Sequence, residues 1–168
     1  MFFKRRFTLA IACLVLASAW PAWAGSGDGA KASSIEHGRY VLQISGCNDC
    51  HTPGYAESGG TLPEQRWLTG SPVGWHGPWG TTYAPNLRLF MQTLSEREWL
   101  HVAKTTTYRP PMPWFALRRM TDADLVAMYR FIRHLGPAGT AAPAYAPPGT
   151  EPVGPVVRFP ELPAEGKK

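Results

Sequence analysis

The stretch Cys47-Asn48-Asp49-Cys50-His51 decides how the rest of this 168-residue sequence is interpreted. Two residues separate its cysteines, so the thiols lie about one turn apart if the segment is helical, and a histidine follows directly. The remaining cysteine, Cys13, lies in an apolar run near the N-terminus. Two cysteines this close do not make a disulfide scaffold, so the pair needs a local explanation.

Three kinds of site use two closely spaced cysteines. A thioredoxin-like dithiol is expected after a strand in a βαβ unit, and neither is indicated here. A structural zinc site needs four ligands, and the sequence has no second Cys-x-x-Cys and no suitably spaced pair of histidines. The third kind is covalent attachment of a c-type haem, for which Cys-x-x-Cys-His is the typical pattern. We therefore expect Cys47 and Cys50 to bind one haem c through its vinyl groups, with His51 as the proximal iron ligand.

Residues 1–24 have the parts of a signal peptide. A basic start at 4–6 precedes an apolar run at 7–20, and Ala22 and Ala24 supply a small-x-small cleavage site. The run is shorter than the roughly 20 residues that span a bilayer. We expect cleavage after Ala24 and a periplasmic mature protein without an integral membrane segment, which agrees with haem attachment outside the cytoplasmic membrane.

The net charge gives little support for a nucleic-acid partner. The chain has 17 Lys and Arg against 12 Asp and Glu, but the basic residues at 4–6 belong to the expected leader. The mature chain is then close to neutral, which removes most of the argument for binding a polyanion.

Helix signals lie on both sides of the cysteine motif. Residues 25–34 are rich in Gly and Ser and predict a flexible lead-in, followed by a helix over 35–45 capped by Ser33 or Ser34. A capping-box pattern at 95–98 predicts a helix that continues to about Lys104.

The last predicted helix has the clearest periodicity. It begins at a Thr121 cap and continues to Leu135, with apolar residues at helical spacing, and Gly136-Pro137 ends it. Residues 137–168 carry 8 of the 17 prolines, which predicts an extended or disordered tail that packs loosely at best. Residues 52–92 are glycine-rich and mostly irregular, so we expect a bound group to order them.

Further residues carry a family resemblance. Over residues 37–136 the chain resembles a mono-haem class I c-type cytochrome, and it is most similar to the cytochrome c domains that accompany bacterial periplasmic alcohol, sugar-acid and aldehyde dehydrogenases. Residues 87–91 and the tail depart from the family pattern. The matching segments are Gly38-Arg39-Tyr40, Cys47-x-x-Cys50-His51-Thr52, Gly59-Gly60, Asn86-Leu87, Met112-Pro113-Trp114, Asp122-x-Asp124-Leu125 and Tyr129-x-Phe131-Ile132-Arg133.

The resemblance implies an all-α cytochrome c domain at 35–136, with about three main helices and long irregular loops wrapped around one covalent haem. It also implies an electron-transfer protein rather than an enzyme. The expected partners are a periplasmic dehydrogenase as electron donor and a downstream cytochrome or terminal oxidase as acceptor.

The distal iron ligand has several candidates. Met128 lies on the apolar stripe of the last helix, and Met91 and Met120 have packing explanations. Met112 lies between two prolines that stiffen an extended loop, and it is the methionine that the family motif selects. We predict Met112 as the sixth ligand, while His76, another methionine or an open site stay as alternatives. Filled axial positions favour electron transfer over small-molecule chemistry.

The haem propionates need hydrogen-bond donors, and ordinary loop packing explains the available donors equally well. The candidates are Trp75, Trp79, Tyr83, Asn86 and Arg88. Four arginines of the last third of the chain could steer an acidic partner, although a solvated face explains them better. They are Arg118, Arg119, Arg130 and Arg133.

Two alternative functions stay open. The first is a haem protein with an open or labile sixth site that binds or reduces a small molecule. The second is a non-catalytic haem subunit whose tail, 137–168, docks onto a larger dehydrogenase complex.

Overall fold

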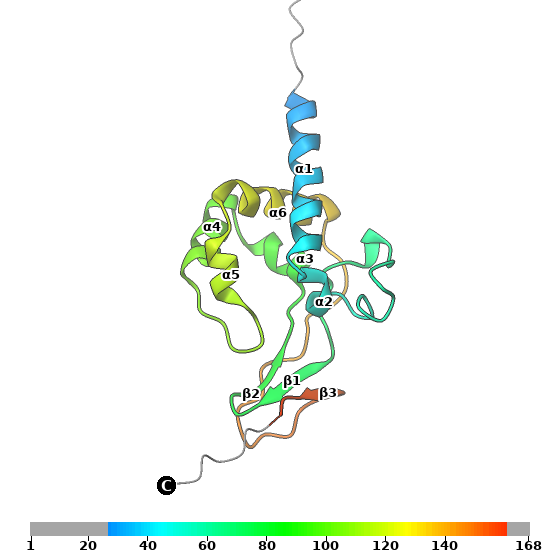
Figure 1. Cartoon of the computed structure of the whole chain (residues 1–168), viewed down its shortest axis with the longest axis vertical. Coiled ribbons are helices and arrows are strands. Elements are labelled where there is room, and N and C mark those ends of the chain that lie inside the picture. Colours follow the sequence, from blue (N-terminus) through cyan, green and yellow to red (C-terminus); the bar gives the residue numbers. More distant parts are fainter. Residues whose placement is uncertain (1–26, 161–168) are drawn as a thin grey trace, which may run out of the picture.

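The computed structural model describes residues 27–160, so the predicted signal peptide and its cleavage site lie outside the described residues. Helices form one part and a small sheet lies at the far end from the start of α1 (Figure 1). The helices are α1 (Gly27–Ile44), α2 (Cys47–His51), α3 (Leu87–Phe90), α4 (Glu96–Thr105), α5 (Trp114–Arg119) and α6 (Asp122–Leu135). Two 3-10 turns, η1 (Glu64–Arg66) and η2 (Met91–Thr93), and three strands, β1 (Gly74–Gly77), β2 (Gly80–Tyr83) and β3 (Val156–Arg158), complete the chain.

The crossing of α1 and α6 is the largest contact between elements (Figure 1). Gly38 permits it, because a Cβ at this position would lie 2.0 Å from the backbone oxygen of Ala127. Around the crossing, the fully buried side chains of Leu42, Leu125 and Phe131 form the centre of the hydrophobic core.

Local capping signals placed two helices correctly. The Ser95 side chain accepts the Glu98 N–H, and the Glu98 side chain accepts the Ser95 N–H, which confirms the predicted capping box at the start of α4. The Thr121 hydroxyl accepts the Asp124 N–H at the start of α6, and the helix ends at Leu135 as predicted.

The prediction of a flexible lead-in is wrong for residues 27–34, which form the first turns of α1. Ala30, Lys31 and Ala32 are good helix formers. Adding turns to a helix that is already nucleated needs no further nucleation step. The helix therefore continues upstream of the serines that were expected to cap it.

The all-α prediction needs correction, because the glycine-rich loop contains part of a three-stranded sheet with strand order β2-β1-β3. Strands β1 and β2 pair as an antiparallel hairpin, and β1 pairs with β3 in parallel. Thr81, Thr82 and Tyr83 in β2 are residue types that favour strands. Four-residue strands between glycines are too short to give a clear periodic signal.

The prediction of a loosely packed tail is wrong for residues 137–160. Ala146 forms an isolated bridge with Thr81, and the Tyr83 hydroxyl donates to the Val153 carbonyl and accepts its N–H, both at 2.8 Å. Figure 1 shows this segment running from the end of α6 back along the molecule to the sheet. A proline-rich segment forms few backbone hydrogen bonds within itself. Here its backbone forms them with the β1–β2 hairpin instead.

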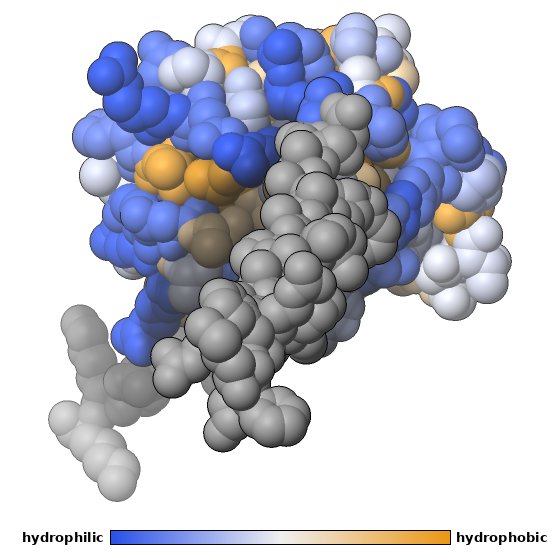
Figure 2. Space-filling view, turned by 90° about the horizontal axis from the view of Figure 1, so that it is seen from above, coloured by the Kyte–Doolittle hydropathy of each residue, from blue (hydrophilic) through white to orange (hydrophobic). Residues whose placement is uncertain are grey.

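The described surface is mainly polar. Outside its grey atoms, Figure 2 shows a face of mostly hydrophilic residues with a few separate hydrophobic patches. Within residues 27–160, no helix has both the length and the apolar character needed to cross a bilayer.

Candidate functional site

The Cys-x-x-Cys-His motif forms the short helix α2. Gly46 precedes it with φ 67°, a left-handed conformation that favours glycine and lets the chain turn sharply out of α1. Cys47, Cys50 and His51 all line the same cavity. The sequence motif therefore places both cysteines and the histidine around one cavity.

That cavity has a volume of about 410 Å³ and is lined mainly by apolar and aromatic side chains. Its walls come from α2, the end of the hairpin, α3 and η2, the loop that carries Met112, and α6. The lining outside the motif includes Trp75, Thr82, Tyr83, Ala84, Pro85, Leu87, Phe90, Met91, Trp99, Tyr108, Arg109, Met112, Leu117, Met128, Ile132 and Tyr145.

The His51 side chain is held as a neutral imidazole. Its Nδ1 lies 2.8 Å from the Pro85 carbonyl oxygen, which only accepts, so Nδ1 carries the proton and Nε2 keeps its lone pair. Burial lowers the pKa of His51, and the hydrogen bond to Pro85 opposes this shift only in part. The imidazole is thus fixed in one tautomer with Nε2 available to a metal ion.

A buried network that was not predicted from the sequence fixes α2 to the neighbouring loop. The Thr52 hydroxyl donates to the Asn48 side chain and accepts the Leu68 N–H, both at 2.7 Å. Leu68 has φ 61°, which is rare for a branched residue, and its carbonyl accepts the N–H groups of Leu87 and Arg88. The residue from which this network could have been predicted is Thr52, a small polar residue directly after the motif.

Cys47 and Cys50 form no disulfide with each other, and neither thiol ionises readily. Burial, aided by the negative charge of Asp49, raises the pKa of Cys47 to about 12, and the same causes raise the pKa of Cys50. Redox-active dithiols have the opposite shift. Over residues 27–160, no three His, Cys, Asp or Glu side chains gather as a metal cluster.

Of the four methionines within residues 27–160, three line the cavity and one does not. Met91 is fully buried and Met128 is 2 % exposed, so both belong to the packed core as well as to the cavity wall. Met112 is half-buried and is the cavity-lining methionine on a loop. Met120 packs against the core outside the cavity lining, and His76 also lies outside it, with Nδ1 2.8 Å from the Thr81 hydroxyl.

Comparison with known families agrees with this geometry. The family described as Cytochrome c matches residues 35–136. The chain belongs to the cytochrome c family. Neither the comparison with curated proteins nor that with solved structures gives a significant match. Membership supports a haem-based electron carrier rather than an enzyme, and it implies a haem c attached at Cys-x-x-Cys-His, the motif that this cytochrome forms with Cys47, Cys50 and His51.

The cavity of this cytochrome fits such a group. Its apolar lining suits a porphyrin, and two reduced thiols and a neutral imidazole are the groups that covalent attachment and iron ligation require. Thr82 adds an independent sign, because this residue lines the cavity and its buried hydroxyl has no hydrogen-bond partner among the described residues. An unpaired buried hydroxyl is costly unless a bound group satisfies it.

Of the five predicted propionate donors, two line the cavity and three do not. Trp75 and Tyr83 line the cavity, although the Tyr83 hydroxyl is already bonded to Val153. Trp79 lies outside the lining, where its ring packs on Phe159 with centroids 5.1 Å apart. The remaining two candidates are Asn86 and Arg88.

Asn86 and Arg88 lie outside the cavity lining, and their side-chain N–H groups bond to backbone carbonyls. The Asn86 amide donates to the carbonyls of Ala138 and Thr140, and its side-chain oxygen caps α3. The buried Arg88 guanidinium donates to the carbonyls of Gln65, Leu135 and Gly136. Both side chains are used to connect loops, because buried backbone carbonyls at the end of α6 need donors.

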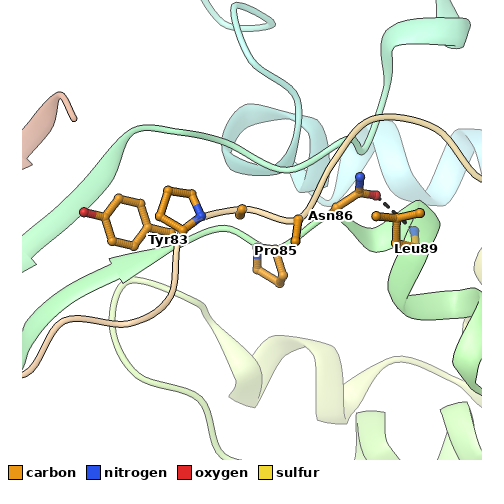
Figure 3. A pocket seen from close by; sticks show the side chains of 7 residues that line it. Tyr83, Pro85, Asn86 and Leu89 are labelled. Carbon is orange, nitrogen blue, oxygen red and sulfur yellow. Dashed lines mark hydrogen bonds between the residues drawn. The ribbon is translucent and has the colours of Figure 1, made fainter. Parts of the chain in front are cut away.

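A smaller pocket lies beside the segment that supports His51. Its volume is about 190 Å³, and it is lined by Tyr83, Pro85, Asn86, Leu89 and the tail residues 141–143 (Figure 3). The Asn86 side chain accepts the Leu89 N–H at 3.0 Å, drawn dashed in Figure 3. The tail therefore packs beside Pro85, whose carbonyl orients the imidazole of His51.

Proposed function

We propose that this cytochrome is an exported one-electron carrier whose haem iron is bound by His51 Nε2 and Met112 Sδ. The observation that carries the proposal is the single cavity lined by both thiols, the imidazole and the Met112 side chain. When bound, the haem exchanges one electron between its ferrous and ferric states.

The residues around the haem determine the balance between its ferrous and ferric states. His51 is pre-oriented by Pro85, so little rearrangement accompanies ligation. A neutral thioether from Met112 favours the ferrous state more than a second imidazole would. The apolar walls add to this preference, because they penalise the extra charge of ferric iron. Two protein ligands leave no open position for a substrate.

The direction of electron flow is part of the proposal. The signal-peptide pattern and the resemblance to dehydrogenase-associated domains support a periplasmic relay from a dehydrogenase to a downstream cytochrome or oxidase. The arginine cluster gives this relay little further support. Arg118 stacks on Trp114, Arg130 pairs with Glu96 at 2.9 Å, and Arg133 donates to the Met91 carbonyl at 3.2 Å.

The alternative in which the tail docks onto a larger enzyme loses part of its basis. Within 137–160, the backbone of Ala146 and of β3 is paired with the chain's own hairpin. This part of the tail is therefore not a free docking segment.

The proposal is tested by producing the full chain in a host with working cytochrome maturation machinery. Intact mass reports covalent haem, and the ferric absorption spectrum reports a thioether ligand through its weak charge-transfer band. Met112→Ala should abolish the band. Met120→Ala is the matched control, because Met120 does not line the cavity, and it should keep the band.

The contrary results are equally specific. A Met112→Ala variant that retains the band assigns ligation to another residue, with Met91 and Met128 next to be tested. A high-spin spectrum of the unmodified protein would support the open-site alternative. A folded product that lacks the mass of the haem would exclude the proposed function altogether.

A further inference from the structure

The tail contributes to the haem cavity although it lies outside the residues that match the family. The match ends at residue 136. Tyr145 nevertheless lines the cavity together with Met112 and the residues on either side of it, Pro111 and Pro113. A segment without a family counterpart thus touches the same space as the proposed distal ligand.

Tyr145 is anchored to the hairpin on two sides. Its hydroxyl donates to the Trp79 carbonyl at 2.8 Å. The next residue, Ala146, exchanges two backbone hydrogen bonds with Thr81, at 2.7 and 3.0 Å. The ring therefore has a fixed position relative to β2, even though 36 % of the residue is exposed.

The Met112 loop reaches this fixed ring through Arg109. The guanidinium carbon of Arg109 lies 3.8 Å from the centroid of the Tyr145 ring, well within cation–π range. Arg109 precedes Met112 by three residues on the same loop. Pro110, Pro111 and Pro113 have no N–H groups, so the backbone of this loop has few hydrogen bonds available to fix it. Side-chain contacts must therefore hold the loop in place.

We infer that Arg109 and Tyr145 form a clasp through which the tail holds the Met112 loop against the cavity. Both are positioning residues, and the inference rests on the proposed ligation by His51 and Met112. When the contact between Arg109 and Tyr145 is lost, the Met112 loop moves away from the cavity more readily. An added ligand then displaces Met112 from the iron more easily. The tail therefore helps to determine how strongly Met112 is retained at the sixth coordination position of the iron.

Imidazole binding to the ferric holoprotein measures this directly, because imidazole must displace the sixth ligand. Arg109→Ala and Tyr145→Ala should each increase the apparent imidazole affinity roughly 2- to 5-fold, the effect expected from losing one exposed cation–π contact. The double variant should gain less than the product of the two single effects, because both remove the same contact. Tyr40→Ala is the matched control, an exposed aromatic on α1 outside the cavity lining, and should bind imidazole as the unmodified protein does.

The outcomes separate this inference from the proposed function. If the unmodified protein lacks the thioether band, both fail together. If it has the band and Met112→Ala loses it, but the Arg109 and Tyr145 variants bind imidazole with unchanged affinity, the clasp alone is overturned. Arg109→Ala keeps the test available if Tyr145→Ala does not fold, because it leaves the tail's bonds to the hairpin intact.

Discussion

Gly38→Ala should destabilise the folded holoprotein through the crossing of α1 and α6. A methyl group here would lie 2.0 Å from the oxygen and 2.5 Å from the carbonyl carbon of Ala127, and 2.9 Å from the Cβ of Phe131. Two of these contacts are with backbone, so no flexible side chain can move aside. The helices would have to separate, which would also loosen the packing of Leu42 and Phe131.

The size of the effect follows from two opposing terms. Overpacking a well-packed core costs typically about 1–3 kcal/mol, while replacing a mid-helix glycine by alanine gains about 0.5–1 kcal/mol in helix propensity. Gly29→Ala is the control for a methyl group added to the helix without a clash. Gly29 lies on the same helix, and a Cβ added there would meet no other atom within 4 Å. Because the propensity gain is smaller in the first turn, where Gly29 lies, Gly38→Ala should have a free energy of unfolding below that of Gly29→Ala by up to about 3 kcal/mol.

Guanidinium unfolding of the three haem-loaded proteins, followed by far-UV circular dichroism, supplies the measurement. Gly29→Ala should unfold at the same or a higher denaturant concentration than the unmodified protein, and Gly38→Ala at a lower one. Equal midpoints for the two variants, with equal slopes, would refute the argument that Gly38 is required by the helix crossing.

Three further predictions concern hydrogen bonds. Arg88→Met should lower the free energy of unfolding by about 2–5 kcal/mol, because it leaves buried backbone carbonyls without donors. Arg88→Lys should restore part of this stability. An unchanged unfolding midpoint in Arg88→Met would contradict the prediction. The Thr121 hydroxyl, and secondly His37, hold the pKa of Asp124 below its ordinary value, so this stabilisation is complete above the ordinary pKa and is lost as pH falls through the lower folded-state pKa. Asp124→Asn should thus flatten the loss of stability below about pH 4, by no more than roughly 1 kcal/mol for so exposed a group, and an unaltered pH profile would count against it. Thr82→Val should leave stability nearly unchanged but alter the pH dependence of the reduction potential, if its unpaired hydroxyl donates to a propionate; identical potential–pH curves would exclude that role.

The features that the sequence predicted well depend on neighbouring residues. The capping box of α4 and the Thr121 cap of α6 each need only residues three positions apart, and both are present in the structure. The cysteine motif is similarly local, and it lines the cavity as a unit. For such features, the chemistry of a short segment determines the outcome whatever the rest of the chain does.

The features that could not be predicted from the sequence depend on contacts between residues far apart in the chain. Gly74 pairs with Val156, and no short window contains both residues. Asn86 and Arg88 were considered as propionate donors because of their residue types, but their acceptors are carbonyls near the end of α6 and the start of the tail. Tyr145 had no motif to mark it, because its role depends on how the tail folds back onto the hairpin.

The parallel pairing of β1 with β3 has a consequence for the order of assembly. β3 is among the last residues of the described chain to be synthesised, and pairing between such distant segments is expected late in folding. Tyr145, which contributes to the cavity wall, is likewise synthesised long after Cys47 and Cys50. We therefore expect the maturation machinery to meet a cavity that still lacks the part of its wall that Tyr145 supplies.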